Sequence, residues 1–373
     1  MPDSRDVHLF VPGPVGSTEG VIDAFVRPTV PHYGADFVAR YNRCCRQLQK
    51  IFLTNNDLFL IVGPGTAALD AAMGSSLPSG SRVLSLVNGL FASRLAEMAR
   101  AHGSQVEVME WDLGEPIDVD RVLRRIATEP HLNAVSWVQH ETSTAVLNPV
   151  EPIARACREH GVLSIIDAIS SLGGAELRVD DWGVDLCVSV SNKCIAAPPG
   201  LAPITVSPHA WDAIGANPNT RSWYGDLRTW RRYRREWRGW HPYPTTVPTH
   251  VLFALKVAAE ELLAEGLDAR LEKTSTAAHR VRAAIRELGF QMFVDDAHAS
   301  PITTAVRTRP DIDTETLLRL LRERHGIYLS GGLADLHGVI FRIGHMGTAS
   351  DPDEVDFLLE AIEEALPAAA VPN

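Results

Sequence analysis

Short apolar runs alternate with helix-like segments through most of this 373-residue chain. The first pair is LFLIVGPGTAALDAAM (58–73), in which an apolar run enters a helical pattern through a glycine turn. Helical patterns separate most of the later runs, so the order predicts an α/β domain with a largely parallel sheet and ligands beyond the carboxyl ends of its strands. The later runs are RVLSLV (82–87), QVEVME (105–110), NAVSWVQ (133–139), VLSIIDA (162–168), DLCVSV (185–190) and APITVS (202–207).

The pattern changes near residue 250, where a long helical stretch (249–289) begins. We expect an N-terminal segment (1–20) that contacts the active site, a large domain (21–250) and a smaller α+β domain (251–373). The expected elements of the smaller domain after that stretch are ITTAVRT (302–308), a helix (314–325), GIYLSG (326–331), VIFRIGH (339–345) and a last helix (353–365).

Composition excludes several classes of protein. The net charge of −11 argues against nucleic acid as a partner. We expect no membrane contact, because the chain has no run of about 18 apolar residues. The start, MPDSRDVHLF, lacks the basic and then apolar order of a signal peptide. Five cysteines without C-x-x-C spacing indicate neither a disulfide framework nor a metal site, so we expect a cytoplasmic protein without metal.

The glycine turn Gly63–Ala68 fits the G-x-G-x-x-A pattern that binds a dinucleotide pyrophosphate. Unpaired backbone N–H groups and the helix dipole at such a turn attract any phosphate. A dinucleotide site also needs an acidic residue about 20 positions further on, to hold the ribose. The second run ends instead at Asn88, so a smaller phosphate cofactor is favoured over NAD.

Pyridoxal phosphate is the other common phosphate cofactor of α/β folds, and it requires a lysine, a carboxylate and a group stacked on its ring. Only four of the 35 basic residues are lysines, and three of them lie in helical patterns that indicate solvated positions. Lys193 instead follows the apolar run DLCVSV, and Asp167 ends the run VLSIIDA. Asp167 alone could be a helix cap, but together with Lys193 and the turn it is better interpreted as the partner of the ring nitrogen.

Four segments resemble the class V, fold-type I aminotransferases: HETSTAVLNP (140–149), IDAISSLGG (166–174), SNKCIAAPPG (191–200) and FRIGHMG (341–347). This family includes alanine–glyoxylate, serine–pyruvate, 2-aminoethylphosphonate–pyruvate and pyridoxamine–pyruvate aminotransferases. The resemblance begins at VPGPVG (11–16) and continues to the last helix. It implies a fold-type I transferase, with a large domain whose mostly parallel sheet is flanked by helices, a smaller C-terminal α+β domain, pyridoxal 5′-phosphate as cofactor, and a homodimer with shared active sites.

The resemblance also implies roles for matching positions. Lys193 would bond to the cofactor and move a proton, and Asp167 would pair with the pyridinium nitrogen. Phe91 would stack on the ring, although without the resemblance it would be interpreted as a core aromatic, and Thr142 would approach the ring oxygen. Tyr243 and Thr246 would reach the phosphate from the neighbouring subunit. The other cofactor-binding positions are Gly65, Thr66 and Asn192, and the substrate-binding positions are Gly13 and Arg342, the latter for the α-carboxylate.

The expected activity is ping-pong transfer of an amino group from a small donor, alanine or serine, to glyoxylate or pyruvate. The Arg- and Trp-rich segment RSWYGDLRTWRRYRREWRGW (221–240) leaves an aminophosphonate donor open. The C-terminal motifs resemble pyridoxamine–pyruvate aminotransferase, but Gly65, Thr66 and Tyr243 favour a bound phosphate. A lyase or epimerase on the same fold, or a cofactor-binding module without activity, are further alternatives. A cysteine desulfurase is disfavoured because no cysteine follows Cys194.

Overall fold

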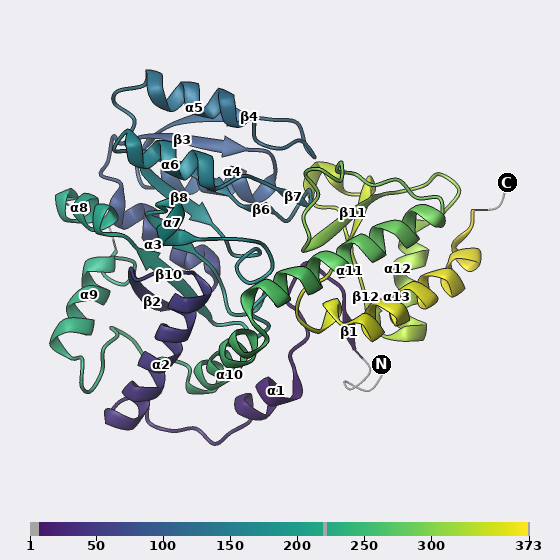
Figure 1. Ribbon diagram of the computed structural model, residues 1–373, viewed down its shortest axis with the longest axis horizontal. Helices are drawn as coiled ribbons and strands as arrows, with labels where there is room; N and C mark the ends of the chain where they lie inside the picture. Colours follow the sequence, from purple (N-terminus) through teal and green to yellow (C-terminus); the bar gives the residue numbers. More distant parts are fainter. Residues whose placement is uncertain (1–6, 219–221, 372–373) are drawn as a thin grey trace.

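A computed structural model describes residues 7–218 and 222–371. The first six residues of the expected N-terminal segment, and Arg221 of the Arg- and Trp-rich segment, lie outside the described residues. Figure 1 shows a larger domain built on a central sheet and a smaller domain beside it, with helix α11 (Leu267–Glu287) lying along their junction. Within the described ranges, no helix combines the length and apolar character that a bilayer span requires.

The central sheet has seven strands, six of them parallel. The exception is β10, which runs antiparallel between β9 and β2. The predicted α/β architecture with a mostly parallel sheet is therefore confirmed. In spatial order the strands are β2 (Asp57–Val62), β10 (Leu201–Val206), β9 (Leu186–Val188), β8 (Leu163–Asp167), β5 (Ala134–Val138), β3 (Arg82–Val87) and β4 (Gln105–Glu110).

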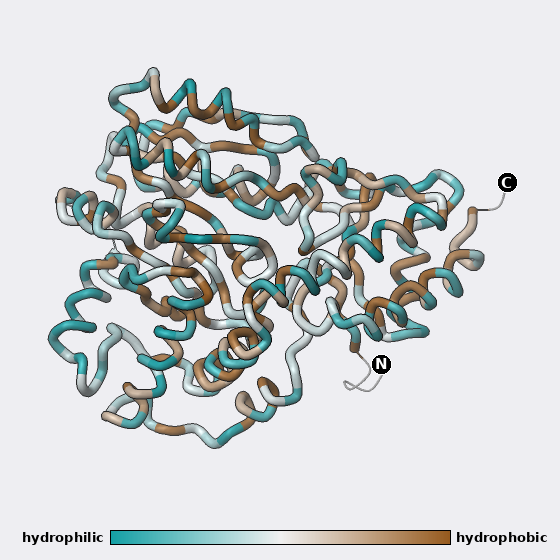
Figure 2. Tube along the Cα trace, viewed as in Figure 1, coloured by the Kyte–Doolittle hydropathy of each residue, from teal (hydrophilic) through white to brown (hydrophobic). Residues whose placement is uncertain are grey.

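The central strands are apolar on both faces. Every residue of β5, β8, β9 and β10 is buried, whereas the edge strand β4 exposes most of its side chains. Strands that lie between two layers of helices have such continuous hydrophobic runs. Figure 2 shows hydrophobic residues concentrated along the strands and polar ones on the outer turns of the helices.

Helices of the larger domain pack on the sheet and on one another. Helix α3 packs on β8, β9, β10 and α4, while α4 packs on β3, β4 and β5. Helix α10 packs on α1 and α2, and α2 also packs on β2. The bounds are α1 (Glu19–Phe25), α2 (Ala35–Ile51), α3 (Gly65–Ser76), α4 (Leu90–Ala101), α5 (Val119–Thr128), α6 (Glu151–Glu159), α7 (Val179–Trp182), α8 (Pro208–Ala216), α9 (Leu227–Glu236) and α10 (Thr249–Glu265).

The smaller domain contains an antiparallel sheet and a second hydrophobic core. The predicted helical stretch 249–289 is two helices, because Gly266 adopts a φ of 94° between α10 and α11. Buried side chains of α10 belong to the core of the larger domain, so we propose that the domains divide at Gly266. The other elements are β11 (Thr303–Arg307), α12 (Thr314–His325), β12 (Ile327–Tyr328), β13 (Ser330–Gly331), η1 (Ala334–Leu336), β14 (Ile340–Gly344), η2 (Gly347–Ser350), α13 (Pro352–Ala365) and η3 (Leu366–Ala369).

The N-terminal segment joins the two domains. Strand β1 (His8–Leu9) pairs in parallel with β12 of the smaller domain. The amide of Gly344 then donates to the carbonyl oxygen of Phe10 at 2.6 Å, and a side chain at Gly344 would clash with the Val11 carbonyl oxygen. This close backbone contact holds the following residues against the larger domain.

The register of the sheet places three loops together. Val138, Asp167 and Val188 are direct neighbours across β5, β8 and β9. The chain segments that follow these residues therefore leave the sheet at the same edge. A short hairpin of β6 (His140–Glu141) and β7 (Val146–Leu147) forms directly after β5.

Candidate active site

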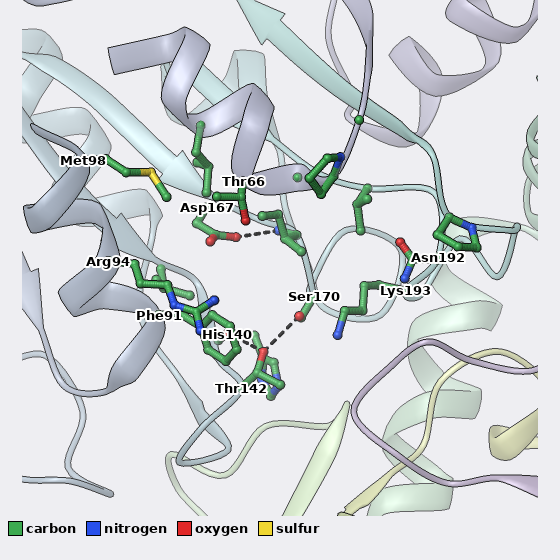
Figure 3. Close-up of a pocket in the computed structure, with 18 of the residues that line it drawn as sticks. Thr66, Phe91, Arg94, Met98, His140, Thr142, Asp167, Ser170, Asn192 and Lys193 are labelled. Atoms are coloured by element: carbon green, nitrogen blue, oxygen red, sulfur yellow. Dashed lines mark hydrogen bonds between the residues drawn. The ribbon is translucent and has the colours of Figure 1, made fainter. Parts of the chain in front are cut away.

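A cavity of about 470 Å³ lies at this carboxyl edge of the sheet. Its wall combines the glycine turn, the start of α4 and the loops after β5, β8 and β9. Figure 3 shows Thr66 and Asp167 at one side of the cavity, Phe91 and Arg94 at another, and Lys193 pointing inward from the opposite wall. Seven predicted site residues line it: Gly65, Thr66, Phe91, Thr142, Asp167, Asn192 and Lys193.

The glycine turn presents backbone N–H groups at the start of α3. Gly63 has a φ of 146°, and its amide donates to the carbonyl oxygen of Gly200 at 3.0 Å. A Cβ atom at Gly65 would lie 2.5 Å from Cδ1 of Ile169, so any side chain there would displace Ile169 from its position in the cavity wall. The first amides of a helix have no intrahelical acceptor, and those of Gly65 and Thr66 are therefore available to an anion.

Lys193 lies in a loop that returns to the sheet. Ser191 anchors this loop through its hydroxyl, which donates to the Pro198 carbonyl oxygen at 2.6 Å. The Lys193 Nζ donates to the carbonyl oxygen of Pro12, and a side chain at Gly13 would clash with Lys193. Burial lowers the pKa of Lys193, and the nearby Arg342 also lowers it, while Cys194 and Asp167 oppose the shift. A lowered pKa increases the fraction of the neutral, nucleophilic amine.

Asp167 is a buried carboxylate at the last position of β8. Its Oδ1 accepts from the amide of Ile169 at 2.8 Å, and no cation lies within ion-pair distance of it among the described residues. Burial raises the pKa of Asp167 to about 7, with a smaller contribution from Glu141. A cationic N–H group in the cavity would supply the missing partner.

The position of Phe91 depends on the motif HETST. Glu141 accepts hydrogen bonds from the amides of Phe91 at 3.4 Å and Ala92 at 2.9 Å, and the Ser143 hydroxyl accepts from Leu90 at 3.0 Å. The carboxylate therefore caps α4 and orients the Phe91 ring toward the cavity. Sequence reasoning missed Glu141, whose signal was a carboxylate inside an otherwise apolar and hydroxyl-rich segment.

Thr142 connects two loops of the site. Its hydroxyl donates to the hydroxyl of Ser170 at 2.9 Å, a contact drawn in Figure 3. Ser170 also lines the cavity and was not predicted, although it lies in the quoted segment IDAISSLGG. Asn192 lines the cavity beside Lys193 and is half-buried.

Arg342 lies in β14, behind Thr142 and outside the lining of the cavity. Its Nη1 donates to the carbonyl oxygen of Thr142 at 2.9 Å. Its Nε and Nη2 donate to the carbonyl oxygen of Gly331 at 3.1 and 2.9 Å. Burial lowers its pKa to about 10, which leaves it charged at neutral pH. Two of its five N–H groups remain for another acceptor.

The structure does not bring Tyr243 and Thr246 to the cavity of their own chain. Tyr243 is fully buried among Phe37, Tyr41 and His241, and its hydroxyl donates to the carbonyl oxygen of His32. Thr246 is exposed. Donation of the Tyr243 hydroxyl proton to a phosphate in a neighbouring subunit would have to replace its bond to His32.

Two further cavity residues were missed by sequence reasoning. The Arg94 guanidinium lies over the Phe91 ring at 4.9 Å and is exposed at the mouth. His140 is buried in the wall next to Thr142. The sequence indicated them only by their position, since each lies within three residues of a predicted site residue. The Arg- and Trp-rich segment contributes no described residue to the lining.

Comparison with known proteins identifies the family. The family model of Aminotransferase class-V matches residues 22–350. The chain belongs to the class V aminotransferases. This family assignment confirms the resemblance seen in the four sequence segments, and with it a pyridoxal-phosphate-dependent aminotransferase activity.

Relatives of this class V aminotransferase cover nearly its whole length. An uncharacterized aminotransferase of Methanocaldococcus jannaschii is 35% identical over 361 residues, which are 96% of this chain and 92% of that protein. The ureidoglycine–glyoxylate aminotransferase structure from Bacillus subtilis has a TM-score of 0.92 and 31% identity, covering 97% of this chain and 93% of that one. The pyridoxamine–pyruvate aminotransferase structure from Mesorhizobium loti also has a TM-score of 0.92, with 30% identity and coverages of 98% and 93%.

The cavity of this class V aminotransferase fits pyridoxal phosphate. The glycine turn offers amides to a phosphate, and Ile169 and Phe91 offer apolar surface to a ring. Asp167 lacks the cation that a protonated ring nitrogen would supply, and Lys193 has a lowered pKa. The lysine, the carboxylate and the ring-stacking group that the cofactor requires thus lie in one cavity with a phosphate-binding turn.

Proposed function

We propose that this aminotransferase moves the amino group of a small amino donor, alanine or serine, to a small 2-oxo acid, glyoxylate or pyruvate. The observation that carries the proposal is the position of Arg342, which donates to the backbone of Thr142 directly behind the wall of the Lys193 cavity. A guanidinium with two unused N–H groups is suited to one carboxylate, and a small donor and a small oxo acid share only that group. Relatives named for glyoxylate or pyruvate support the acceptor.

Each group of cavity residues would have its own role in the reaction. The amides of Gly65 and Thr66 would hold the phosphate, and Phe91 would hold the ring in place. The bound cofactor supplies an electron sink for the bond at the substrate α-carbon. Asp167 would keep the ring nitrogen protonated, and the Lys193 amine would remove and return the proton at the α-carbon.

A donor screen tests the proposal. Alanine or serine should convert the cofactor to its amino form with loss of visible absorbance, and glyoxylate or pyruvate should restore that absorbance. A lyase or epimerase would release product or invert the donor without stoichiometric accumulation of the amino form. Failure of both donors with both acceptors would contradict the proposed substrates.

The structure gives less support to the other donors considered. The segment 221–240 was the reason to consider an aminophosphonate, and its described residues do not line the cavity. The phosphate turn is intact, which favours a bound cofactor phosphate over a free pyridoxamine substrate. Five buried, unpaired cysteines are typical of a reducing compartment, and we propose the cytoplasm.

Replacing Arg342 by alanine should raise KM for both donor and acceptor, because each carries the α-carboxylate. Loss of a charge-assisted pair corresponds to roughly 1.5–3 kcal/mol, or a tenfold to hundredfold rise. Arg342→Lys should recover part of the loss, since it keeps the charge but not the fork. Steady-state kinetics with each substrate varied in turn measure both constants. A defect confined to one half-reaction would show that Arg342 contacts one substrate's side chain instead.

We also propose a homodimer with shared active sites. The first helix and the chain after it expose an unusual number of apolar side chains, which indicates a protein interface. Thr246 is exposed on the connector before α10 and is free to contact a second chain. The exposed apolar residues are Ile22, Phe25, Val26, Val30 and Tyr33.

Mixed dimers test the shared site. Lys193→Ala and a Tyr243→Phe/Thr246→Ala double variant, each impaired alone, can be unfolded together and refolded. With shared sites, one site of each mixed dimer carries both lesions and the other is native, so activity should return to about a quarter of the wild-type value after random pairing. Self-contained sites would give no native site, and no recovery in dimers shown to be mixed would refute sharing.

A further inference from the structure

His140 is a buried side chain with an unused hydrogen-bonding capacity. It is 1% exposed, and neither Nδ1 nor Nε2 has a hydrogen-bond partner among the described residues. Its ring lines the same cavity as Lys193, and Figure 3 shows it next to Thr142, away from Thr66 and the phosphate turn. Buried polar groups without partners are rare in native proteins, so this one requires an explanation.

The neighbours of His140 do not provide a partner, because their own groups are already engaged. Glu141 accepts from the start of α4 and from Ser143, whose hydroxyl donates to it at 2.5 Å. The Thr142 hydroxyl donates to Ser170. The motif is thus fully hydrogen-bonded on either side of one imidazole that faces the cavity.

The charges around His140 define the ligand it can take. Burial, Lys193 and Arg342 together lower the pKa of His140 to about 3, so the ring is neutral and has one N–H donor. Arg342, which stays charged at neutral pH, is a cation, and a cation favours an anion on its side of the cavity. The cofactor phosphate would lie at the other end of the cavity, on the glycine turn. The remaining anion is the carboxylate of the substrate.

We propose that His140 donates a hydrogen bond to the substrate α-carboxylate and, with Arg342, selects substrates that carry one. Arg342 bonds to the backbone of Thr142, two residues after His140, so the guanidinium and the imidazole belong to the same part of the site. This inference rests on the proposed function, in which a small oxo acid occupies the cavity. His140 is a specificity residue in this scheme, and it neither holds the cofactor nor moves a proton.

Two amine probes distinguish the contribution of the substrate carboxylate to the reaction rate from that of the amine. Aminooxyacetate and methoxyamine react with the bound cofactor through the same aminooxy nitrogen, and only aminooxyacetate has a carboxylate. In the holoenzyme, His140→Leu should slow the spectral change with aminooxyacetate by roughly 10-fold to 100-fold, the effect expected for a hydrogen bond to a charged group. The rate with methoxyamine should not change. His140→Asn, which keeps an N–H donor, should recover most of the rate with aminooxyacetate.

His345 provides a matched control for stability. It is equally buried, but its nitrogens lie 3.1 Å from the Thr304 hydroxyl and 3.2 Å from the Pro301 carbonyl oxygen. In the cofactor-free protein, His345→Leu should lower Tm because it leaves these groups unpaired. His140→Leu should leave Tm unchanged or raise it, because no protein group loses a partner.

Two results would overturn the proposal. An equal loss of rate with both probes would place His140 on the cofactor, and a fall in Tm like that of His345→Leu would give it a structural role. A wild-type enzyme that prefers aminooxyacetate yet fails with alanine, serine, glyoxylate and pyruvate would refute the proposed substrates. The assignment of His140 to the carboxylate would then stand.

Discussion

Replacing Lys193 by alanine is expected to abolish transamination, with a fall in kcat of roughly 10⁴-fold or more, since it removes both the covalent attachment point and the proton carrier. The phosphate turn, Phe91 and Asp167 remain, so the variant should still bind pyridoxal phosphate without a covalent bond. Dialysis should therefore remove the cofactor from the variant more readily than from the wild type. Half-reactions with alanine or serine measure the catalytic loss.

The other lysines serve as controls. Lys256 forms an ion pair with Glu260 and Lys273 forms one with Asp351, both partly exposed. Alanine at either position should leave activity close to that of the wild type. Borohydride reduction followed by peptide mapping should place the pyridoxyl group on Lys193. A pyridoxyl group on Lys50, Lys256 or Lys273 would refute the assignment.

Asp167→Asn is expected to lower kcat by roughly 10²-fold to 10³-fold, the usual effect of removing one preorganised electrostatic group. An amide cannot hold the ring nitrogen in its protonated form, so the electron sink is weakened. Asp167→Glu should retain more activity because it keeps the charge. Single-turnover half-reactions, which exclude product release, measure the loss. Activity of Asp167→Asn equal to the wild type would remove the carboxylate from the chemistry.

Asp167→Asn, which should lower kcat, should increase the thermal stability of the cofactor-free protein. Burial raises the pKa of Asp167 to about 7, above its unfolded value of about 3.9. The stability contributed by such a group is complete below the unfolded pKa and is lost as the pH rises through the folded pKa. Asp167→Asn should therefore raise Tm of the cofactor-free protein at pH 8 and have a smaller effect at pH 5, where the carboxyl of the folded protein is protonated. Melting curves at the two pH values test the sign.

Strand positions could be predicted because buried strands are apolar along their whole length. RVLSLV coincides with β3, and VLSIIDA differs from β8 by one residue at each end. The direction of a strand could not be predicted in this way, because the hydropathy pattern of an apolar run is the same for both directions. The antiparallel β10 therefore required the structure. The break at Gly266 was also missed, since a single glycine within a helical pattern is often tolerated.

Residues that line the cavity could be predicted where a polar side chain follows the end of a strand, as for Asp167 and Lys193. Contacts between distant segments could not. The bond from Tyr243 to His32 and the hydrogen bonds of Arg342 to backbone carbonyls depend on chain segments far from each motif. His140 is likewise one of several polar residues in HETST, and the sequence alone does not distinguish it from the others. Its lack of a partner becomes visible only when every neighbouring group has been placed.

The N-terminal segment has a consequence for the order in which the enzyme is made. Residues 8–13, which pair with β12 and then cover Lys193, leave the ribosome before the residues of either domain. Their partners in β12 and β14 are synthesised more than 300 residues later. A nascent chain can thus complete the central sheet, the glycine turn and Asp167 while Lys193 is still uncovered. The N-terminal segment can cover Lys193 in this way only once β12 and β14 have been made, so the active site is completed after the central sheet.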